Sequence, residues 1–234
     1  MSLSKFEYIS NLIHNVNPYD NFPIEKYKLQ INRFTEDTSL FEKLILDLKP
    51  NLIIEVGSWM GYSAISMAKC LIKEELDCGI ICVDTWLGAR EFWSTKDETI
   101  GWWNFSNHEH FKKQNDDLGL LNGYPTVYHQ FMANVIHSDT QKYITPFPQT
   151  SNIASRWFKS NQVKANFIYI DGSHEYDDVK VDIENYWQLL DDGGIMIGDD
   201  YLITDVKIAV DEFANSNNLI PNVSQSPFWY IVKE

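Results

Sequence analysis

Residues 52–69 read LIIEVGSWMGYSAISMAK, an apolar run that leads through a glycine-containing turn into a helical pattern. The run itself lacks in–out alternation, which is typical of a strand covered on both faces, as in a parallel sheet. After the turn, Ile65 and Ala68 recur at helical spacing. Gly57 and Gly61 would let the backbone turn sharply beneath a nucleotide. This stretch predicts a strand, a ligand-binding turn and a helix.

The same unit recurs along the chain. Further apolar runs, each followed or preceded by a helical pattern, occupy residues 79–83, 144–148, 167–170, 194–197 and 228–232. The two prolines of the second of these runs would confine it to a strand end or a sheet edge. Strands that alternate with helices predict a doubly wound, mostly parallel α/β sheet with right-handed crossovers.

One helical pattern shows how the elements are expected to end. Val179, Ile183, Tyr186 and Leu190 lie at helical spacing, and the glycines at 193–194 are expected to stop the helix.

The length of 234 residues favours one domain, residues 1–234, with residues 1–50 as an N-terminal helical extension. Residues 88–123 hold several aromatic residues without a steady period. A connection this long is typical of a lid or an acceptor-binding loop. It could equally form an extra packing layer or a contact between subunits of a homo-oligomer.

Composition excludes several classes of partner. Nineteen basic and 33 acidic residues give a formal net charge of −14, which would repel a phosphate backbone and argues against nucleic acid. No apolar run has the roughly 20 residues of a membrane helix. The first residues lack the features of a signal peptide. The odd number of cysteines fits reduced thiols. A cytoplasmic protein without a membrane partner is therefore expected.

The glycine turn favours an adenosine ligand other than a dinucleotide. A dinucleotide fingerprint would want glycines where Trp59 and Tyr62 stand. The Glu55 carboxylate would repel a diphosphate but attract an ammonium group. S-adenosylmethionine carries an ammonium group, a sulfonium and no phosphate. Cofactor contacts are predicted for Glu55, Gly57, Ser58, Gly61, Tyr62 and Ser63.

Asp84 ends the second run and is placed to accept hydrogen bonds from both ribose hydroxyls. Thr85 and Trp86 follow it, and Trp86 could pack on the adenine or lie in the core. Thr150 and Ser151 could touch the adenine edge, with Ser151 equally suited to cap the helix at 152–160. Without a cofactor role, Glu55 would be a satisfied strand-end carboxylate and Asp84 a helix cap.

Three segments together resemble class I S-adenosylmethionine-dependent methyltransferases. They are IIEVGSWMGYSAISMAK, CVDTW and FIYIDGSHEYDDVKVDIENYWQLLDDGGIMIGDDY, within residues 50–232. The resemblance is to the macrocin-type sugar O-methyltransferases and, more distantly, to the catechol O-methyltransferases. It implies a seven-stranded Rossmann-like sheet, and the acidic motifs DGSHEY and GDDY are its most specific part. Residues 1–50 and 88–123 depart from it.

The acidic motifs predict a metal site. Asp171 ends one apolar run, and Asp199 and Asp200 end the next. Carboxyl ends of neighbouring parallel strands, about 4.8 Å apart, can reach one ion. Oxygen donors without a nearby cysteine suit Mg²⁺ first, or Mn²⁺ or Ca²⁺. The resemblance implies that these residues bind a cation that chelates two neighbouring oxygens of the acceptor. Alternatively, the acids are solvated turn residues.

His174 lies three residues beyond Asp171 and is our candidate general base for a hydroxyl proton, with Asp171 beside it in the catalytic group. Its alternative is a capping histidine or one that orients a metal ligand. The motif His108-Glu109-His110 is interpreted as a solvated loop.

The sequence thus predicts methyl transfer to a hydroxyl of a small molecule, a diol or sugar, assisted by a divalent cation. Two other functions stay open at this stage. One is a nicotinamide-dependent oxidoreductase, and the other is a non-catalytic module that binds S-adenosylmethionine.

Overall fold

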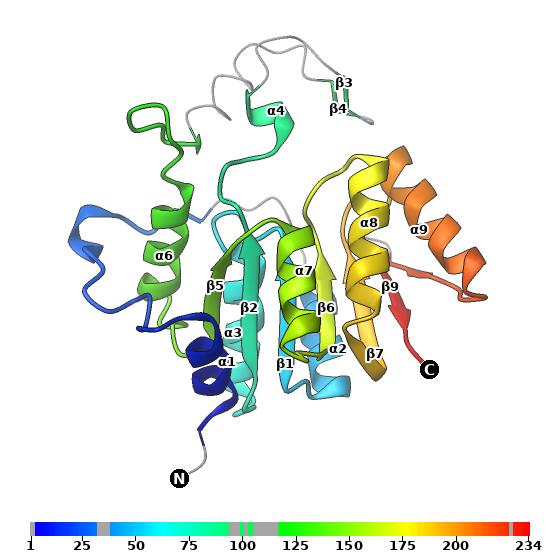
Figure 1. The fold of residues 1–234 in the computed structure, drawn as a ribbon, viewed down its shortest axis with the longest axis horizontal. Helices are drawn as coiled ribbons and strands as arrows, with labels where there is room; N and C mark the ends of the chain where they lie inside the picture. The colour runs from blue at the N-terminus through cyan, green and yellow to red at the C-terminus, as the bar shows by residue number, and fades with distance from the viewer. Residues whose placement is uncertain (1–2, 32–37, 94–98, 101–102, 105–116, 225–226) are drawn as a thin grey trace.

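In a computed structural model of the chain, a seven-stranded sheet forms the centre of the molecule, in the order β5-β2-β1-β6-β7-β9-β8 (Figure 1). The structure describes residues 3–31, 38–93, 99–100, 103–104, 117–224 and 227–234. The neighbours from β5 to β7 pair in parallel, whereas β9 is antiparallel to both β7 and β8. The doubly wound, mostly parallel α/β fold predicted from the sequence is confirmed.

The strands of this sheet are short and mostly buried. They are β1 (Leu52–Val56), β2 (Gly79–Asp84), β5 (Ile144–Pro148), β6 (Ala165–Ile170), β7 (Leu190–Gly198), β8 (Asn222–Val223) and β9 (Trp229–Val232). A separate two-stranded ladder pairs β3 (Thr99–Ile100) with β4 (Trp103–Asn104). All six apolar runs predicted to be strands are strands. Within the main sheet only β8, two exposed residues long, had no signal of its own, and β3 and β4 outside it were not predicted either.

Helices cover both faces of the sheet, as the lack of alternation in the strands requires (Figure 1). They are α1 (Lys5–Ile13), α2 (Ser39–Leu48), α3 (Tyr62–Lys73), α4 (Arg90–Trp93), α6 (Val127–His137), α7 (Ser151–Ser160), α8 (Tyr176–Trp187) and α9 (Thr204–Ser216), with a 3₁₀ turn at Ile24–Lys26. One core layer joins α2, α3 and α6 to the sheet. The other joins α7, α8 and α9 to it.

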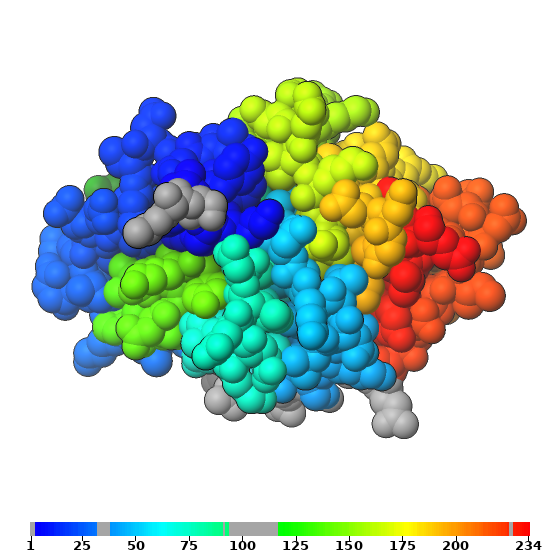
Figure 2. All heavy atoms as spheres, turned by 90° about the horizontal axis from the view of Figure 1, so that it is seen from below, coloured from blue at the N-terminus to red at the C-terminus, as the bar shows by residue number. Residues whose placement is uncertain are grey.

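The N-terminal extension protects the β5 edge of the sheet. His14 Nε2 lies 2.7 Å from the carbonyl oxygen of Pro146, and the Tyr19 hydroxyl donates to the carbonyl oxygen of Ile144 at 2.9 Å. An open edge strand invites pairing with another chain, so these contacts close it. In Figure 2, which views the molecule from below, the N-terminal residues lie beside the segment near residue 160.

The end of α8 differs from the expectation. The helix stops at Trp187 and is capped at Gln188, before the glycines at 193–194. Leu190 belongs to β7, where it pairs with Ala165 ahead of an irregularity in the ladder. The helical spacing of Leu190 was misleading because a buried strand residue can continue an apolar period by chance.

Residues 88–123 are described only in part. Within them the structure shows α4, β3 and β4, and a turn in which Leu121 bridges to Tyr124. Residues 94–98, 101–102 and 105–116, which include His108-Glu109-His110, lie outside the described residues. The interpretation of this segment as a lid therefore stays a prediction. Of the helices in the described residues, none has the length and apolar character needed to cross a bilayer.

We predict that Gly198→Ala destabilises the fold by about 1–3 kcal/mol, because overpacking strains a close-packed core. A Cβ at this position would lie 2.4 Å from the ring of Trp229, which is 1% exposed and cannot yield. The change is measured as a lower urea midpoint at constant m-value.

Gly79→Ala is the matched control, since its Cβ would meet its nearest neighbour at an ordinary 3.5 Å. Equal midpoints for the two variants would contradict the tight packing of Trp229 on Gly198.

Candidate active site

Parallel pairing brings the acidic motifs to one edge of the sheet. Ile170 of β6 pairs with Gly198 of β7, so Asp171 and Asp199 directly follow paired residues. The backbone N–H of Asp171 also donates to the carbonyl oxygen of Val56 at 2.8 Å. The carboxyl ends of β1, β6 and β7 therefore meet where open α/β sheets bind ligands.

Three side chains converge at this edge. Ligand atoms of Asp171, His174 and Asp200 all lie within 4.8 Å of one another. The Nε2 atom of His174 is 2.8 Å from Oδ2 of Asp200, with the two side chains 29% and 25% exposed. The structure thus brings together the acids of both motifs and the histidine between them, in a place that solvent and a ligand can reach.

Asp199 lies beside this cluster without joining it. Its Oδ1 accepts a hydrogen bond from the backbone N–H of Asp200 at 2.7 Å. Asp200 has a left-handed backbone with φ 60°, which turns its side chain toward His174 while Asp199 stays at the strand end. The predicted metal ligands were Asp171, Asp199 and Asp200, whereas the grouped ligand atoms come from Asp171, His174 and Asp200.

Electrostatics at Asp171 are unfavourable for its ionised form. Burial raises the pKa of Asp171 well above its usual range, and the negative charges of Asp199 and Asp200 raise it further. A hydrogen bond from the Tyr169 hydroxyl to Oδ2 of Asp171, 2.8 Å long, acts in the opposite direction. A bound dication would relieve this repulsion. The donor set of carboxylates and one imidazole fits Mg²⁺ or Mn²⁺.

The glycine turn lies directly against the acidic edge. A Cβ built on Gly57 would fall 1.9 Å from the carbonyl oxygen of Asp171, and the φ of Gly57 is +86°. Only glycine meets both conditions. Gly61, at φ +87°, begins α3 and packs against the ring of Phe131. The predicted cofactor turn and the predicted metal site are therefore neighbours.

Glu55 is fully buried and satisfied by internal donors. Its carboxylate accepts hydrogen bonds from the hydroxyls of Ser58 and Ser63, each 2.5 Å long, and from the Cys82 thiol at 3.3 Å. Burial raises the pKa of Glu55, and these hydrogen bonds lower it. This geometry is the satisfied strand-end carboxylate given above as the alternative. Glu55, Ser58 and Ser63 therefore hold the turn to the sheet from beneath.

Asp84 supports the same turn from its other side. Its Oδ2 accepts from the backbone N–H of Ser58 at 2.9 Å and of Trp59 at 2.8 Å, and its Oδ1 accepts from that of Trp86 at 2.7 Å. Asp84 is only partly buried, and a carboxylate has about four acceptor positions. The turn uses three of these positions, which leaves at most one for a ribose hydroxyl.

Trp86 lies in the core, the second of the two positions left open above. Its side chain is 1% exposed, its indole N–H donates to the carbonyl oxygen of Trp59 at 2.8 Å, and its ring packs on Tyr128 and Phe131. Stacking of Trp86 on adenine does not fit this packing. Thr85, next to Asp84 in the chain, is partly exposed. Tyr62, the first residue of α3, is partly exposed as well.

The cap of α7 is Thr150, one residue before the residue suggested as the cap. Its hydroxyl accepts from the backbone N–H of Ile153 at 3.3 Å, and Ser151 is the first residue of the helix. Ser151 instead contacts α8, where its carbonyl oxygen accepts from the Tyr186 hydroxyl at 3.0 Å. The adenine contact predicted for Thr150 and Ser151 stays a prediction.

Two buried polar residues near the site were missed. Tyr169 precedes Asp171 by two positions, and the period of a strand places both on one face, which is a usable signal. Asp182 is 5% exposed and lies beside Val179 and Ile183 on the apolar face of α8. An acidic residue on an otherwise apolar helix face is the sequence signal by which Asp182 could have been found.

The model of a family described as a methyltransferase domain matches residues 54–201, more than half of the chain. The chain belongs to this methyltransferase family. It is an S-adenosylmethionine-dependent methyltransferase, so the class I resemblance is confirmed and the nicotinamide-dependent oxidoreductase is excluded. No curated protein sequence matches the chain.

Solved structures of low sequence identity share the fold. An O-methyltransferase from Bacillus cereus in complex with SAH aligns at a TM-score of 0.54 and 12% identity, over 100% of this chain and 92% of that one. The O-methyltransferase NovP aligns at 0.57 and 15% identity, over 83% and 78%. CalS11, a calicheamicin methyltransferase, aligns at 0.52 and 16% identity, over 97% and 91%.

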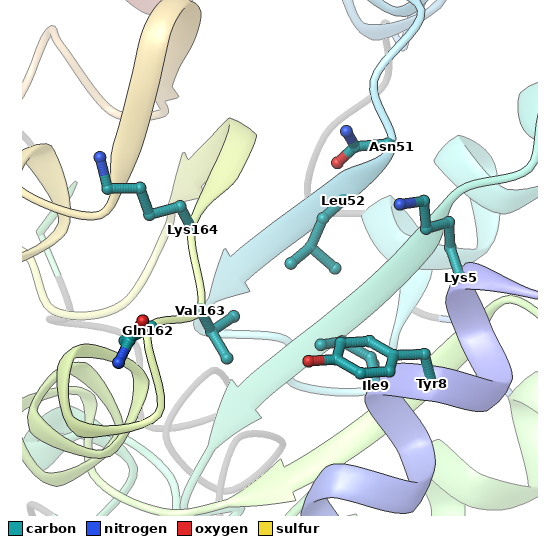
Figure 3. Close-up of a pocket in the computed structure, with 8 residues that line it drawn as sticks. All are labelled: Lys5, Tyr8, Ile9, Asn51, Leu52, Gln162, Val163 and Lys164. Atoms are coloured by element: carbon teal, nitrogen blue, oxygen red, sulfur yellow. The ribbon is translucent and has the colours of Figure 1, made fainter.

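A hollow of about 140 Å³ lies at the opposite end of the methyltransferase sheet (Figure 3). Asn51 and Leu52 at the start of β1, and residues 162–164 before β6, line it together with α1. It opens at the amino ends of the strands, far from the acidic cluster, and is not part of the candidate active site.

We predict that Asp182→Asn stabilises the metal-free methyltransferase at pH 8 by about 1–3 kcal/mol and has little effect at pH 4. Burial raises the pKa of Asp182 to about 6. Folding of the wild-type protein therefore loses stability as the pH rises from about 4 to about 6, where the unfolded chain ionises and the folded one still holds its proton. The asparagine variant lacks this loss.

The measurement is urea unfolding in EDTA at both pH values. Asp177→Asn is the matched control, because Asp177 is exposed on the same helix. An Asp182→Asn variant no more stable than the wild type at pH 8 would contradict the pKa shift of this buried acid.

Proposed function

We propose that this methyltransferase transfers the methyl group of S-adenosylmethionine to a hydroxyl oxygen of a small molecule with neighbouring hydroxyls, a diol or a sugar. A divalent cation at the acidic edge assists the reaction. The observation that carries the proposal is the convergence of Asp171, His174 and Asp200 beside the glycine turn. The O-methyltransferase descriptions of structural neighbours support oxygen as the acceptor atom.

The turn at residues 57–61 and Asp84 would bind the cofactor. The left-handed glycines would bring the backbone close to the ligand, and the one remaining acceptor position of Asp84 suits a ribose hydroxyl. Because Gly57 packs on the carbonyl of Asp171, a cofactor bound on this turn would lie next to the acidic cluster, where its sulfonium methyl could face the acceptor. The acids also favour a cationic sulfonium over a neutral analogue.

Asp171 and Asp200 would hold the cation, with Asp199 adjusting to complete the set. Oxygen ligands suit Mg²⁺, the cation that we expect. When bound, the cation lowers the pKa of a coordinated hydroxyl and orients it toward the methyl group. Tyr169 keeps Asp171 in place through its hydroxyl.

His174 is the proposed general base. A carboxylate only accepts, so Nε2 of His174 donates its hydrogen to Oδ2 of Asp200, 2.8 Å away. The proton that the base takes up would go to Nδ1, and the Asp200 carboxylate would stabilise the resulting imidazolium. The hydroxyl proton passes to His174, the oxygen forms its bond to the methyl carbon, and the carbon–sulfur bond breaks. S-adenosylhomocysteine leaves with a neutral sulfur.

We predict that Asp171→Asn abolishes Mn²⁺ binding and cation-dependent turnover while S-adenosylhomocysteine still binds within a few-fold of wild type. The variant loses a charged oxygen ligand but leaves the glycine turn unchanged. Isothermal titration calorimetry measures the affinity for each ligand. Turnover is measured as the S-adenosylhomocysteine formed from S-adenosylmethionine when a panel of diols and sugars is offered as acceptors.

Asp192→Asn serves as the matched control, since Asp192 is exposed near the other end of β7. Full turnover in excess EDTA would refute the role of the cation.

We predict that His174→Gln lowers turnover by about 10²–10⁴-fold, the usual contribution of a general base. Glutamine can donate to Asp200 but cannot accept a proton at neutral pH. Binding of S-adenosylhomocysteine and Mn²⁺ should stay within about twofold of wild type, and the residual rate should lose its acidic pH limb.

Metal binding and the pH dependence of turnover distinguish a metal ligand from a general base at His174. Loss of Mn²⁺ binding in this variant would identify His174 as a metal ligand, and full activity across the pH range would exclude it as the base.

A further inference from the structure

A buried amide connects α6 to two distant parts of the chain. The side chain of Asn134 is 0% exposed. Its Oδ1 accepts from the backbone N–H of Gln30 and from Nε2 of Gln130, both at 2.9 Å. Its Nδ2 donates to the carbonyl oxygens of Gln30 at 2.6 Å and of Met60 at 2.9 Å. All four hydrogen-bonding positions of the amide are used.

The orientation of this amide is fixed by its partners. Nδ2 faces two carbonyl oxygens, which only accept, and Oδ1 faces a backbone N–H, which only donates. A flipped amide would oppose oxygen to oxygen and leave buried groups unpaired, which is costly. Asparagine is therefore specified here by three backbone groups.

Met60 lies in the glycine turn, and the amide holds it from the side opposite Asp84. Asp84 accepts the backbone N–H groups of Ser58 and Trp59, whereas Asn134 donates to the carbonyl of Met60. Phe131, one turn earlier on α6, packs under Gly61. The backbone of the turn is thus fixed through N–H groups on one side and through a carbonyl on the other.

Residues 27–30 are attached to the same helix at further points. Gln130 Nε2 donates to the carbonyl oxygen of Lys28 at 2.9 Å, and His137 Nε2 lies 2.9 Å from that of Tyr27. This N-terminal segment therefore lies along α6, and Asn134 is the residue that contacts both it and the glycine turn.

We propose that Asn134 is a positioning residue, which sets the backbone of residues 58–61 for S-adenosylmethionine and couples that turn to the N-terminal segment. The proposal rests on the cofactor binding proposed above. It assigns the N-terminal extension, outside the matched methyltransferase domain, an effect on cofactor affinity that acts through one side chain.

Asn134→Asp tests the proposal with an isosteric change. A carboxylate keeps the two accepted hydrogen bonds but opposes an oxygen to the carbonyls of Gln30 and Met60. We expect the dissociation constant for S-adenosylhomocysteine to rise about tenfold, which corresponds to about 1.4 kcal/mol. Calorimetry at about 15 °C measures it at a temperature where the variant is expected to be folded. Backbone amides of residues 58–62 should also exchange hydrogen faster, while those of β6 and β7 keep their rates.

Asn217→Asp is the matched control for charge and stability. Asn217 is exposed at the end of α9, where its Nδ2 donates to the carbonyl oxygen of Phe213 at 2.8 Å. This variant loses one donated hydrogen bond and gains the same charge, and it should keep wild-type affinity even if its melting temperature falls.

Gln30→Pro tests the coupling without altering α6, because it removes the N–H that Asn134 accepts. Like Asn134→Asp, it should weaken the binding of S-adenosylhomocysteine. If Asn134→Asp does not fold, Gln30→Pro alone still tests the proposal. Wild-type affinity in a folded Asn134→Asp variant, or in Gln30→Pro, would overturn the proposal. A wild-type protein that fails to bind S-adenosylhomocysteine would instead refute the proposed cofactor site.

Discussion

The contact between Gly57 and the carbonyl of Asp171 is the constraint on which the arrangement of the site depends. Parallel pairing of β1, β6 and β7 ends the three strands at one edge, but adjacency of the strands alone would not bring a ligand on the first strand to the acids of the other two. The missing Cβ at Gly57 lets the cofactor turn cross directly over the end of β6. The turn proposed to bind the methyl donor and the acidic cluster are consequently neighbours through the backbone.

Buried acids serve two different purposes at this edge. Glu55 and Asp84 each accept hydrogen bonds from three internal donors, so both hold the turn, and Asp84 has at most one acceptor position left for the proposed ribose contact. Asp171 receives one hydroxyl from Tyr169 and faces two further acids, which leaves its ionised form destabilised. A destabilised carboxylate that solvent can reach is typical of a functional site, whereas a satisfied one is typical of a scaffold.

The parts of the fold that repeat a simple pattern could be predicted. Apolar runs gave every strand longer than two residues in the main sheet, and strand ends placed Asp84, Asp171 and Asp199 at the ligand-binding edge. What depends on partners far apart in the chain could not. Leu190 continues a helical period yet pairs in β7, and the cluster contains His174 where Asp199 was predicted. For Trp86 the sequence left adenine and core open, and the packing decides for the core. Asn134 gives no local signal, because its partners are backbone groups 74 and 104 positions away.

The position of His174 beside Asp200 also bears on how the cation and the proton share one carboxylate. Nε2 donates its hydrogen to the Asp200 carboxylate, so the lone pair of the neutral ring is on Nδ1, where it can serve a proton or a metal ion but not both at once. An Asp200 oxygen that coordinates a dication can no longer stabilise a protonated imidazole at 2.8 Å to the same degree. The carboxylate that holds the imidazole in place is thus one that the proposed cation would also use. The histidine and the proposed cation site are therefore coupled through the side chain of Asp200.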